Sequence, residues 1–129
     1  MTSTMVANKY PVFTTQISKD DAKFANADEV IAYIKEQVDA HPVAGYISTF
    51  DHYTHTTSLP QYGMPSNIVD IKVAIFCFGP EVPMPEIVAA RPRSIGVVEE
   101  TDKFIVTFMD PPAPALRDVM TSWVNGIRK

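Results

Sequence analysis

The residues best suited to chemistry lie in one short segment, Phe50-Asp51-His52-Tyr53-Thr54-His55-Thr56-Thr57, which contains two of the three histidines of the chain. Histidine is the side chain whose charge changes most readily near neutral pH, and it is the commonest metal ligand. Asp51 beside the imidazoles of His52 and His55 suggests either acid–base chemistry or the binding of an ion. A strand end that faces water, with Asp51 capping the turn, is the purely structural alternative, and the sequence leaves it open.

The backbone conformation after Asp51 decides whether these side chains converge. In a continued strand, Asp51 and His55 share one face while His52 points to the other, because side chains alternate along a strand. If the chain turns after His52, the two imidazoles can converge. A tight metal site needs at least three protein ligands at fixed geometry, and His-x-x-His with one acid falls short of that number. We therefore predict no dedicated metal site.

Cys77 is a second candidate for ligand binding. It lies in an apolar run that suits a buried strand, where a free cysteine packs as a small hydrophobic residue. A helix that begins just downstream could instead lower its pKa and make the thiol reactive. The familiar glycine-rich, P-loop, C-x-x-C, H-E-x-x-H and G-x-S-x-G signatures are absent from the chain. No signature identifies a cofactor, and methionines and aromatics that could line a haem site fill cores in the same way.

Arg91 and Arg93 are separated by one proline and form a third candidate. Guanidinium groups bind carboxylates and phosphates through two parallel hydrogen bonds, so two arginines that enter a strand beside a pocket could hold an anionic ligand. The alternative is an ordinary solvated pair, or a salt bridge to Glu99 or Asp70. The sequence does not decide between these interpretations.

The composition is that of an ordinary globular domain. The chain has 129 residues, of which 46% are hydrophobic and 20% are charged, which is enough for one domain with its own core. The formal net charge is −4 and no basic stripe appears, so nucleic acid and anionic membrane surfaces are poor partners. The apolar runs are strand-sized, the start lacks a signal-peptide pattern, and a single cysteine cannot form an internal disulfide. We therefore expect a cytoplasmic protein.

Hydrophobic periodicity predicts five strands and three helices in residues 10–129, after a disordered tail at residues 1–9. In chain order, the predicted elements are a strand at Tyr10–Ser18, a helix capped by Asn26 and stopped by His41-Pro42, a strand at Val43–His52, a loop at Thr56–Asn67, a strand at Ile71–Phe78, a short helix at Glu86–Ala90, a hairpin of Arg93–Glu99 and Lys103–Met109, and a C-terminal helix with an apolar stripe from Leu116 to Ile127. The order is β-α-β-β-α-β-β-α in a single α+β domain.

This order predicts an antiparallel sheet of about five strands with helices packed on one face. The strand at Ile71–Phe78 is apolar on both faces apart from Lys72, which is typical of a central strand with both sides covered. A helix, a partner subunit or a ligand could cover its second side.

The same order resembles the domain-of-unknown-function family numbered 302. The resemblance is carried by the apolar strand that closes in Gly79-Pro80, by the short helix after it, and by the hairpin from Ser94 to Met109 that ends in Asp110-Pro111. It covers about Tyr10 to Ile127. The resemblance implies an α+β fold and a homodimer, and it implies no catalytic residues.

Three functional hypotheses follow from the sequence. The first is a homodimeric domain that binds a small molecule or ion between the uncovered sheet face and the loop Thr54–Asn67, with His52, His55 and Arg93 as polar anchors. The second is an enzyme in which His52 or His55 is the general acid or base and Asp51 orients it. The third is a structural or protein-interaction module, in which another chain covers the second sheet face.

Overall fold

Six antiparallel strands form one sheet in the computed structural model, which describes residues 1–129. The strands are β1 (Thr2–Val6), β2 (Tyr10–Ser18), β3 (Gly45–Asp51), β4 (Ile68–Cys77), β5 (Arg93–Glu100) and β6 (Lys103–Met109), and the helices are α1 (Ala27–Ala40), α2 (His52–Thr57) and α3 (Pro114–Asn125), with short 3-10 helices η1 (Lys19–Asp21) and η2 (Pro85–Ala90). The strand order across the sheet is β1-β2-β6-β5-β4-β3. The predicted α+β class and antiparallel sheet are confirmed.

Strand β1 makes six strands rather than about five, and it lies where the sequence predicted a disordered tail. Its five residues are all exposed, and they pair with β2 in a register that sets Thr2 opposite Thr14. Ala7 and Asn8 adopt positive φ angles of 53° and 56° in the connecting turn. A short, polar, exposed strand has no alternation of hydrophobic residues to reveal it, which explains why the pattern missed it.

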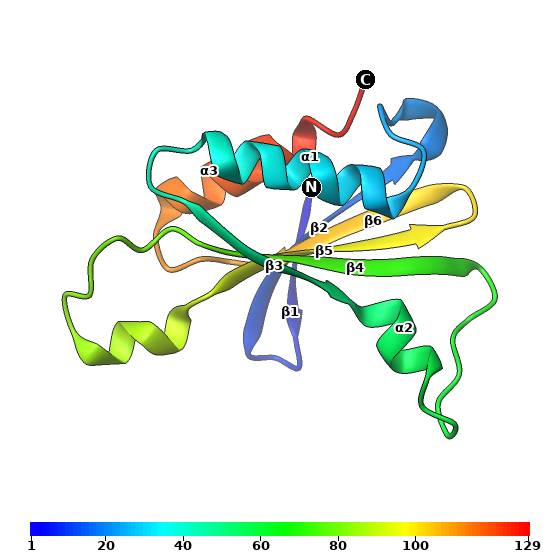
Figure 1. Cartoon of the computed structure of the whole chain (residues 1–129), viewed down its shortest axis with the longest axis horizontal. Coiled ribbons are helices and arrows are strands. Elements are labelled where there is room, and N and C mark those ends of the chain that lie inside the picture. Colours follow the sequence, from blue (N-terminus) through cyan, green and yellow to red (C-terminus); the bar gives the residue numbers. More distant parts are fainter.

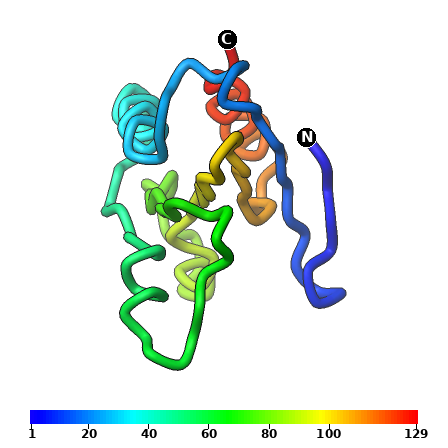
Figure 2. The backbone as a smooth tube through the Cα atoms, turned by 90° about the vertical axis from the view of Figure 1, so that its right-hand side faces the viewer, coloured from blue at the N-terminus to red at the C-terminus, as the bar shows by residue number.

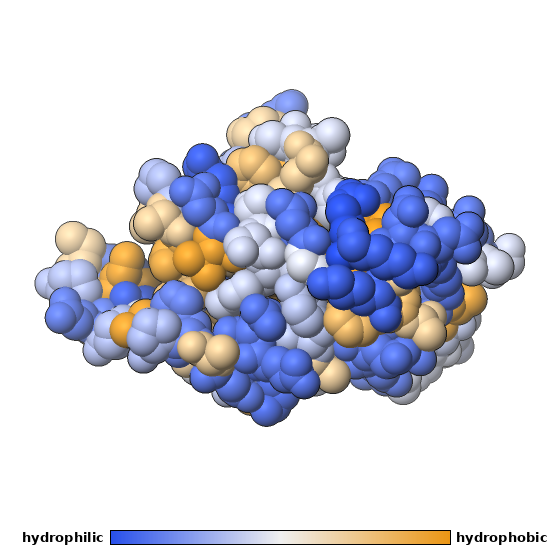
Figure 3. Space-filling view, turned by 90° about the horizontal axis from the view of Figure 1, so that it is seen from above, coloured by the Kyte–Doolittle hydropathy of each residue, from blue (hydrophilic) through white to orange (hydrophobic).

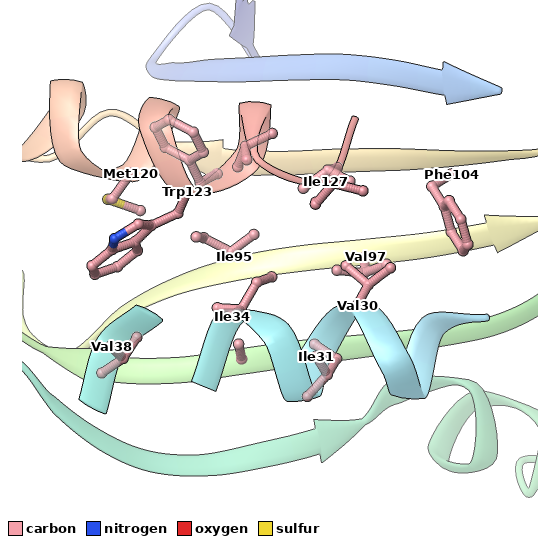
Figure 4. Close-up of a cluster of buried hydrophobic side chains, with 14 of the residues drawn as sticks. Val30, Ile31, Ile34, Val38, Ile95, Val97, Phe104, Met120, Trp123 and Ile127 are labelled. Atoms are coloured by element: carbon pink, nitrogen blue, oxygen red, sulfur yellow. The ribbon is translucent and has the colours of Figure 1, made fainter. Parts of the chain in front are cut away.

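Helices α1 and α3 lie side by side on one face of the sheet (Figure 1), and Figure 2 shows the same layer from the side. Their apolar stripes and the facing strands form the core, of which Figure 4 shows the centre. Val30 and Ile34 of α1 and Met120 of α3 are fully buried there against Ile95 and other strand residues. The predicted amphipathic stripes therefore face the sheet, as their helical spacing requires.

Helix α1 begins and ends at the residues that the sequence indicates. The side chain of Asn26 accepts a hydrogen bond from the Glu29 amide at 2.9 Å, which satisfies one of the free amides of the first turn. The Glu29 carboxylate accepts from the Ala25 amide at 3.1 Å, one residue before the position that a capping box would use. The helix ends at His41, because the residue before Pro42 avoids helical geometry.

Glu99 is a buried carboxylate that the sequence did not single out. Only 7% of the residue is exposed, and its two oxygens accept hydrogen bonds from the Ala27 amide and the Lys19 ammonium, each at 2.7 Å. Glu99 thus satisfies the first amide of α1 from the neighbouring sheet.

The segment after β3 differs from its prediction. The strand ends at Asp51, and His52 begins the short helix α2, where the sequence predicted a strand up to His52 and a loop from Thr56. Strand β4 begins at Ile68, three residues before its predicted start, and ends at Cys77, one residue before its predicted end. Strand ends are poorly marked by periodicity because the pattern fades where pairing stops.

The second face of the sheet has no covering layer of helices. Strand β4 lies between β3 and β5, and the side chains of Ile71, Val73, Ile75 and Cys77 point to this face and are half-buried. Helix α2 and η2 lie toward this side of the sheet at its two ends (Figure 1). None of the helices combines the length and the hydrophobicity that crossing a membrane requires.

Candidate functional site

The candidate residues from the sequence fall into two groups at opposite ends of the sheet. Asp51 pairs with Lys72 on β4, whereas Arg93 pairs with Phe76 on the same strand. Four residues along a strand span roughly 13 Å. The prediction that Arg93 joins His52 and His55 as anchors of one pocket is therefore wrong, because it assumed that the end of one strand and the start of another meet at the same edge.

At the α2 end, the chain turns after Asp51 and brings the two imidazoles together. The ring centres of His52 and His55 are 6.4 Å apart, and the Phe50 ring lies 5.2 Å and 5.7 Å from them. The Thr56 hydroxyl lies 3.0 Å from Nδ1 of His52. Both histidines are exposed, so this group forms a small aromatic cluster on the surface.

Asp51 serves the helix and not the histidines. Its Oδ1 accepts a hydrogen bond from the Thr54 amide at 2.9 Å, and its Oδ2 accepts from the Thr54 hydroxyl at 2.8 Å. These two hydrogen bonds hold the pKa of Asp51 below its ordinary value, and the bond from the amide has the larger effect. No hydrogen bond joins Asp51 to either imidazole, so the carboxylate is a helix cap.

Cys77 lies on the second face of the sheet, half-buried and outside the core between sheet and helices. Its Sγ accepts a hydrogen bond from the Gly79 amide at 3.3 Å. The sequence placed this thiol in a buried strand, and alternation along β4 places it on the less covered side.

The other end of the sheet holds a pocket of about 360 Å³, which we name the arginine pocket. The chain contributes to it from the residue Val43 before β3, the segment after β4, η2, the start of β5 and the residues around the start of α3. Its lining consists of the charged residues Glu81, Arg91 and Arg93, of Gly79, and of nine apolar residues: Val43, Phe78, Pro80, Pro83, Ile87, Ala90, Pro112, Ala113 and Leu116. Such a volume lies at the lower end of the range for small-molecule sites.

Arg93 is a fixed positive charge in the wall of this pocket. Its terminal nitrogens donate to the backbone oxygens of Ala90, Met109 and Asp110 at 2.9–3.2 Å. Its Nε is buried without an acceptor. Burial lowers the pKa of Arg93 below its ordinary value, and the nearby Asp110 carboxylate opposes this effect. The group nevertheless stays charged, since an arginine remains protonated in proteins.

Arg91 differs from Arg93 because its guanidinium has no partner in the protein. No hydrogen bond or ion pair joins it to another residue, although the side chain is half-buried. The guanidinium lies flat on the backbone of Gly79, where an added Cβ would stand only 2.0 Å from Arg91 Cζ. Only glycine leaves room for this arrangement.

Asp110 is engaged elsewhere, whereas Glu81 lines the pocket without an ion pair. Asp110 forms a two-bond ion pair with Arg117, with both N–O distances at 2.7 Å. These hydrogen bonds lower the pKa of Asp110, against a smaller opposing effect of burial. The salt bridges from the arginine pair to Glu99 or Asp70 do not form, because these carboxylates lie six residues along β5 and β4 from Arg93 and its partner Phe76; Lys19 and Lys72 bind them instead.

Sequence reasoning selected both arginines but not the pocket around them. Gly79-Pro80, which the sequence related only to a family resemblance, lines the cavity together with Pro83 and Pro112. Prolines lie before the arginine pair and again after the predicted hairpin, and this arrangement was the available signal in the sequence. Their meeting point depends on tertiary contacts that no local pattern contains.

Comparison with known proteins gives a family and a fold. The model of a family described as a family of unknown function, DUF6858, matches residues 1–129. No curated protein matches the chain. The crystal structure of an uncharacterized conserved protein DUF302 from Bacillus stearothermophilus is similar, with a TM-score of 0.60 and 15% sequence identity over 91% of this chain and 98% of that chain. This similarity confirms the predicted resemblance to family 302 at the level of the fold.

Proposed function

The chain belongs to the DUF6858 family, whose function is unknown, and we propose that it binds a small organic anion in the arginine pocket. One observation carries the proposal, namely the Arg91 guanidinium without a protein partner in a mostly apolar cavity. The guanidinium still reaches water, because none of its nitrogens is among the buried atoms without a partner, and a carboxylate or phosphate can bind it through two parallel hydrogen bonds. A ligand with an anionic group would supply the missing partner.

The local charge also favours an anion. Two arginines and one glutamate line the pocket, so its own charge is positive, whereas the whole chain carries a formal charge of −4. The apolar walls lower the local dielectric constant, which strengthens the attraction of Arg91 and Arg93 for a bound anion. Because the whole chain is acidic, the positive charge of the pocket results from where these residues lie and not from the average composition.

Binding is tested by measuring Tm with a panel of anions, because a ligand that binds only the folded state raises Tm. The panel contains inorganic phosphate, citrate, benzoate and hexanoate. We expect at least one organic anion to raise Tm, and we expect Arg91→Gln to abolish the shift. Lys23→Gln is the control, since it removes one exposed positive charge after η1, at the end of the sheet away from the pocket. A panel without any shift, or a shift that Arg91→Gln leaves unchanged, would overturn the proposal.

The sequence-based alternative, an enzyme that uses His52 or His55 with Asp51, stays a prediction. The hydrogen bonds of Asp51 to Thr54 do not support its role as the orienting partner. NMR titration of the imidazoles tests the idea directly, and ordinary solvent-like pKa values for both would contradict it.

A second candidate function is homodimer formation through the less covered face of the sheet. Ile71, Val73 and Ile75 are half-buried there, and Phe50 of the edge strand β3 is exposed beside them. Apolar side chains in such an arrangement favour an interaction surface. Light scattering over a range of protein concentrations tests this prediction, and a monomer at every concentration would contradict it.

A further inference from the structure

The arginine pocket is almost free of uncharged polar groups, and this restricts the body of its ligand. Apart from Gly79 and the three charged residues, every lining side chain is apolar, and none is a serine, threonine, tyrosine, asparagine or glutamine. A ligand rich in hydroxyl groups would lose hydrogen bonds to water without replacing them, at a cost in affinity. The ligand body must therefore be apolar.

Three prolines reduce the number of backbone donors in the lining of the pocket, which disfavours a phosphate as the anionic group. Pro80, Pro83 and Pro112 line it, and proline has no N–H. Sites for phosphate usually gather several backbone N–H groups around the anion. Here the side-chain donors without a protein acceptor are the Arg91 guanidinium and the buried Nε of Arg93, and the two parallel N–H groups of Arg91 match a planar carboxylate.

The charge of the lining gives the number of anionic groups. Arg91, Arg93 and Glu81 sum to a charge of +1, so one carboxylate neutralises the pocket and a second would leave an unpaired negative charge. Unpaired charges in a partly dry site are costly. The ligand thus carries a single carboxylate.

Exposed apolar residues alternate along the chain with residues that line the pocket. These residues are Val82, Met84 and Val88, which neighbour lining residues in the sequence. Their exposed fractions are 60%, 54% and 57%, respectively. We name these three residues the apolar rim. Figure 3 shows hydrophobic residues gathered at the end of the molecule where η2 lies. A flexible apolar chain that leaves the pocket would gain contact with this surface.

We infer that the ligand is an aliphatic monocarboxylate, with its carboxylate on Arg91 and its hydrocarbon chain along Ile87, Leu116 and the apolar rim. This inference rests on the proposed function, since it names the class of anion for the same pocket. It goes further because it specifies one head group, one charge and an aliphatic body.

Calorimetric titration with straight-chain monocarboxylates from butyrate to decanoate tests this inference. We expect affinity to rise by up to about fourfold for each added CH₂ while the chain remains in contact with apolar surface. Octanol, which lacks the charge, and octanedioate, which has a second carboxylate, should each bind at least about tenfold more weakly than octanoate. Octyl phosphate should also bind more weakly than octanoate.

Two variants separate the head from the tail. Arg91→Gln should weaken octanoate by about tenfold or more. The double variant Val82→Ser, Val88→Ser should weaken decanoate several-fold and leave hexanoate unchanged, whereas Val6→Ser, at an exposed valine of β1, should alter neither. Equal affinity along the series, with Arg91-dependent binding of benzoate or citrate, would overturn this inference and leave the proposed function intact. Failure of every anion to bind would overturn both.

Discussion

Replacement of Gly79 by alanine tests whether the position of Arg91, and not only its charge, makes the pocket bind anions. The new Cβ would stand 2.0 Å from Arg91 Cζ, 2.3 Å from its Nε and 2.5 Å from Nη1. To restore an ordinary contact, the guanidinium must move by roughly 1.4 Å or more. Because the displaced atoms are the end of a flexible side chain, we expect the free energy of unfolding to change by less than about 1 kcal/mol.

The effect on binding should be larger than the effect on stability. Hydrogen bonds to a charged group contribute roughly 1.5–3 kcal/mol each, so losing one aligned bond corresponds to roughly a 10- to 150-fold rise in Kd. Gly79→Ala retains the charge of Arg91, and the long-range attraction for an anion persists. We therefore expect a loss near the lower end of this range and smaller than the loss for Arg91→Gln.

The assay is calorimetric titration of octanoate into the wild type, Gly79→Ala and Gly63→Ala. Gly63 is the matched control, because a Cβ there meets no atom within 4 Å. Circular dichroism in denaturant gives the stability of each variant. Unchanged octanoate affinity in a folded Gly79→Ala protein would refute the reasoning, since it would mean that the guanidinium can bind the anion from another position.

Three further predictions concern stability. Trp123→Ala should lower the free energy of unfolding by about 3–5 kcal/mol, because the buried indole stacks on Phe78 with ring centres 5.5 Å apart; a loss below about 1 kcal/mol in a urea titration would contradict the packing of α3. Glu99→Gln should cost roughly 1.5–3 kcal/mol, because the amide cannot replace the charged bond to Lys19, and Asp20→Asn, at an exposed carboxylate of η1, should cost little. Asp110 has a pKa below its ordinary value in the folded protein, so its contribution to stability is complete at neutral pH and declines as pH falls below about 4. Asp110→Asn should flatten this decline in unfolding measured as a function of pH, and an identical pH profile would count against the ion pair with Arg117.

Most of the fold could be predicted because its elements carry their own signals. The stripe of α1 with its cap at Asn26, the stripe of α3, and the alternation in β2 and β6 are properties of the local sequence. Strand β1 and helix α2 were missed for different physical reasons. The first is exposed on every residue and depends on pairing with β2, whereas the second is a six-residue helix that depends on the two hydrogen bonds of Asp51 to Thr54.

The candidate site was predictable only in part. Side-chain chemistry suffices to propose Arg91 and Arg93 as an anion-binding pair, since guanidinium groups have few other partners of equal strength. The convergence of His52 and His55 required the turn after Asp51, which the sequence offered as one of two possibilities. The walls of the arginine pocket come from Val43, η2 and the start of α3, and contacts between segments so far apart in sequence leave no periodic trace.

The two ends of the sheet differ in what happens to their charges, and this difference favours the arginine end as the site. At the α2 end, Asp51 is satisfied by Thr54 and the histidines are solvated, so the arrangement is complete without a ligand. At the other end, Asp110 is already bound to Arg117, and Arg91 lies unpaired on Gly79 between apolar walls. A half-buried guanidinium with no acceptor in the protein is free to bind an anion through parallel hydrogen bonds. A bound carboxylate would give Arg91 the partner that Thr54 gives Asp51 at the other end.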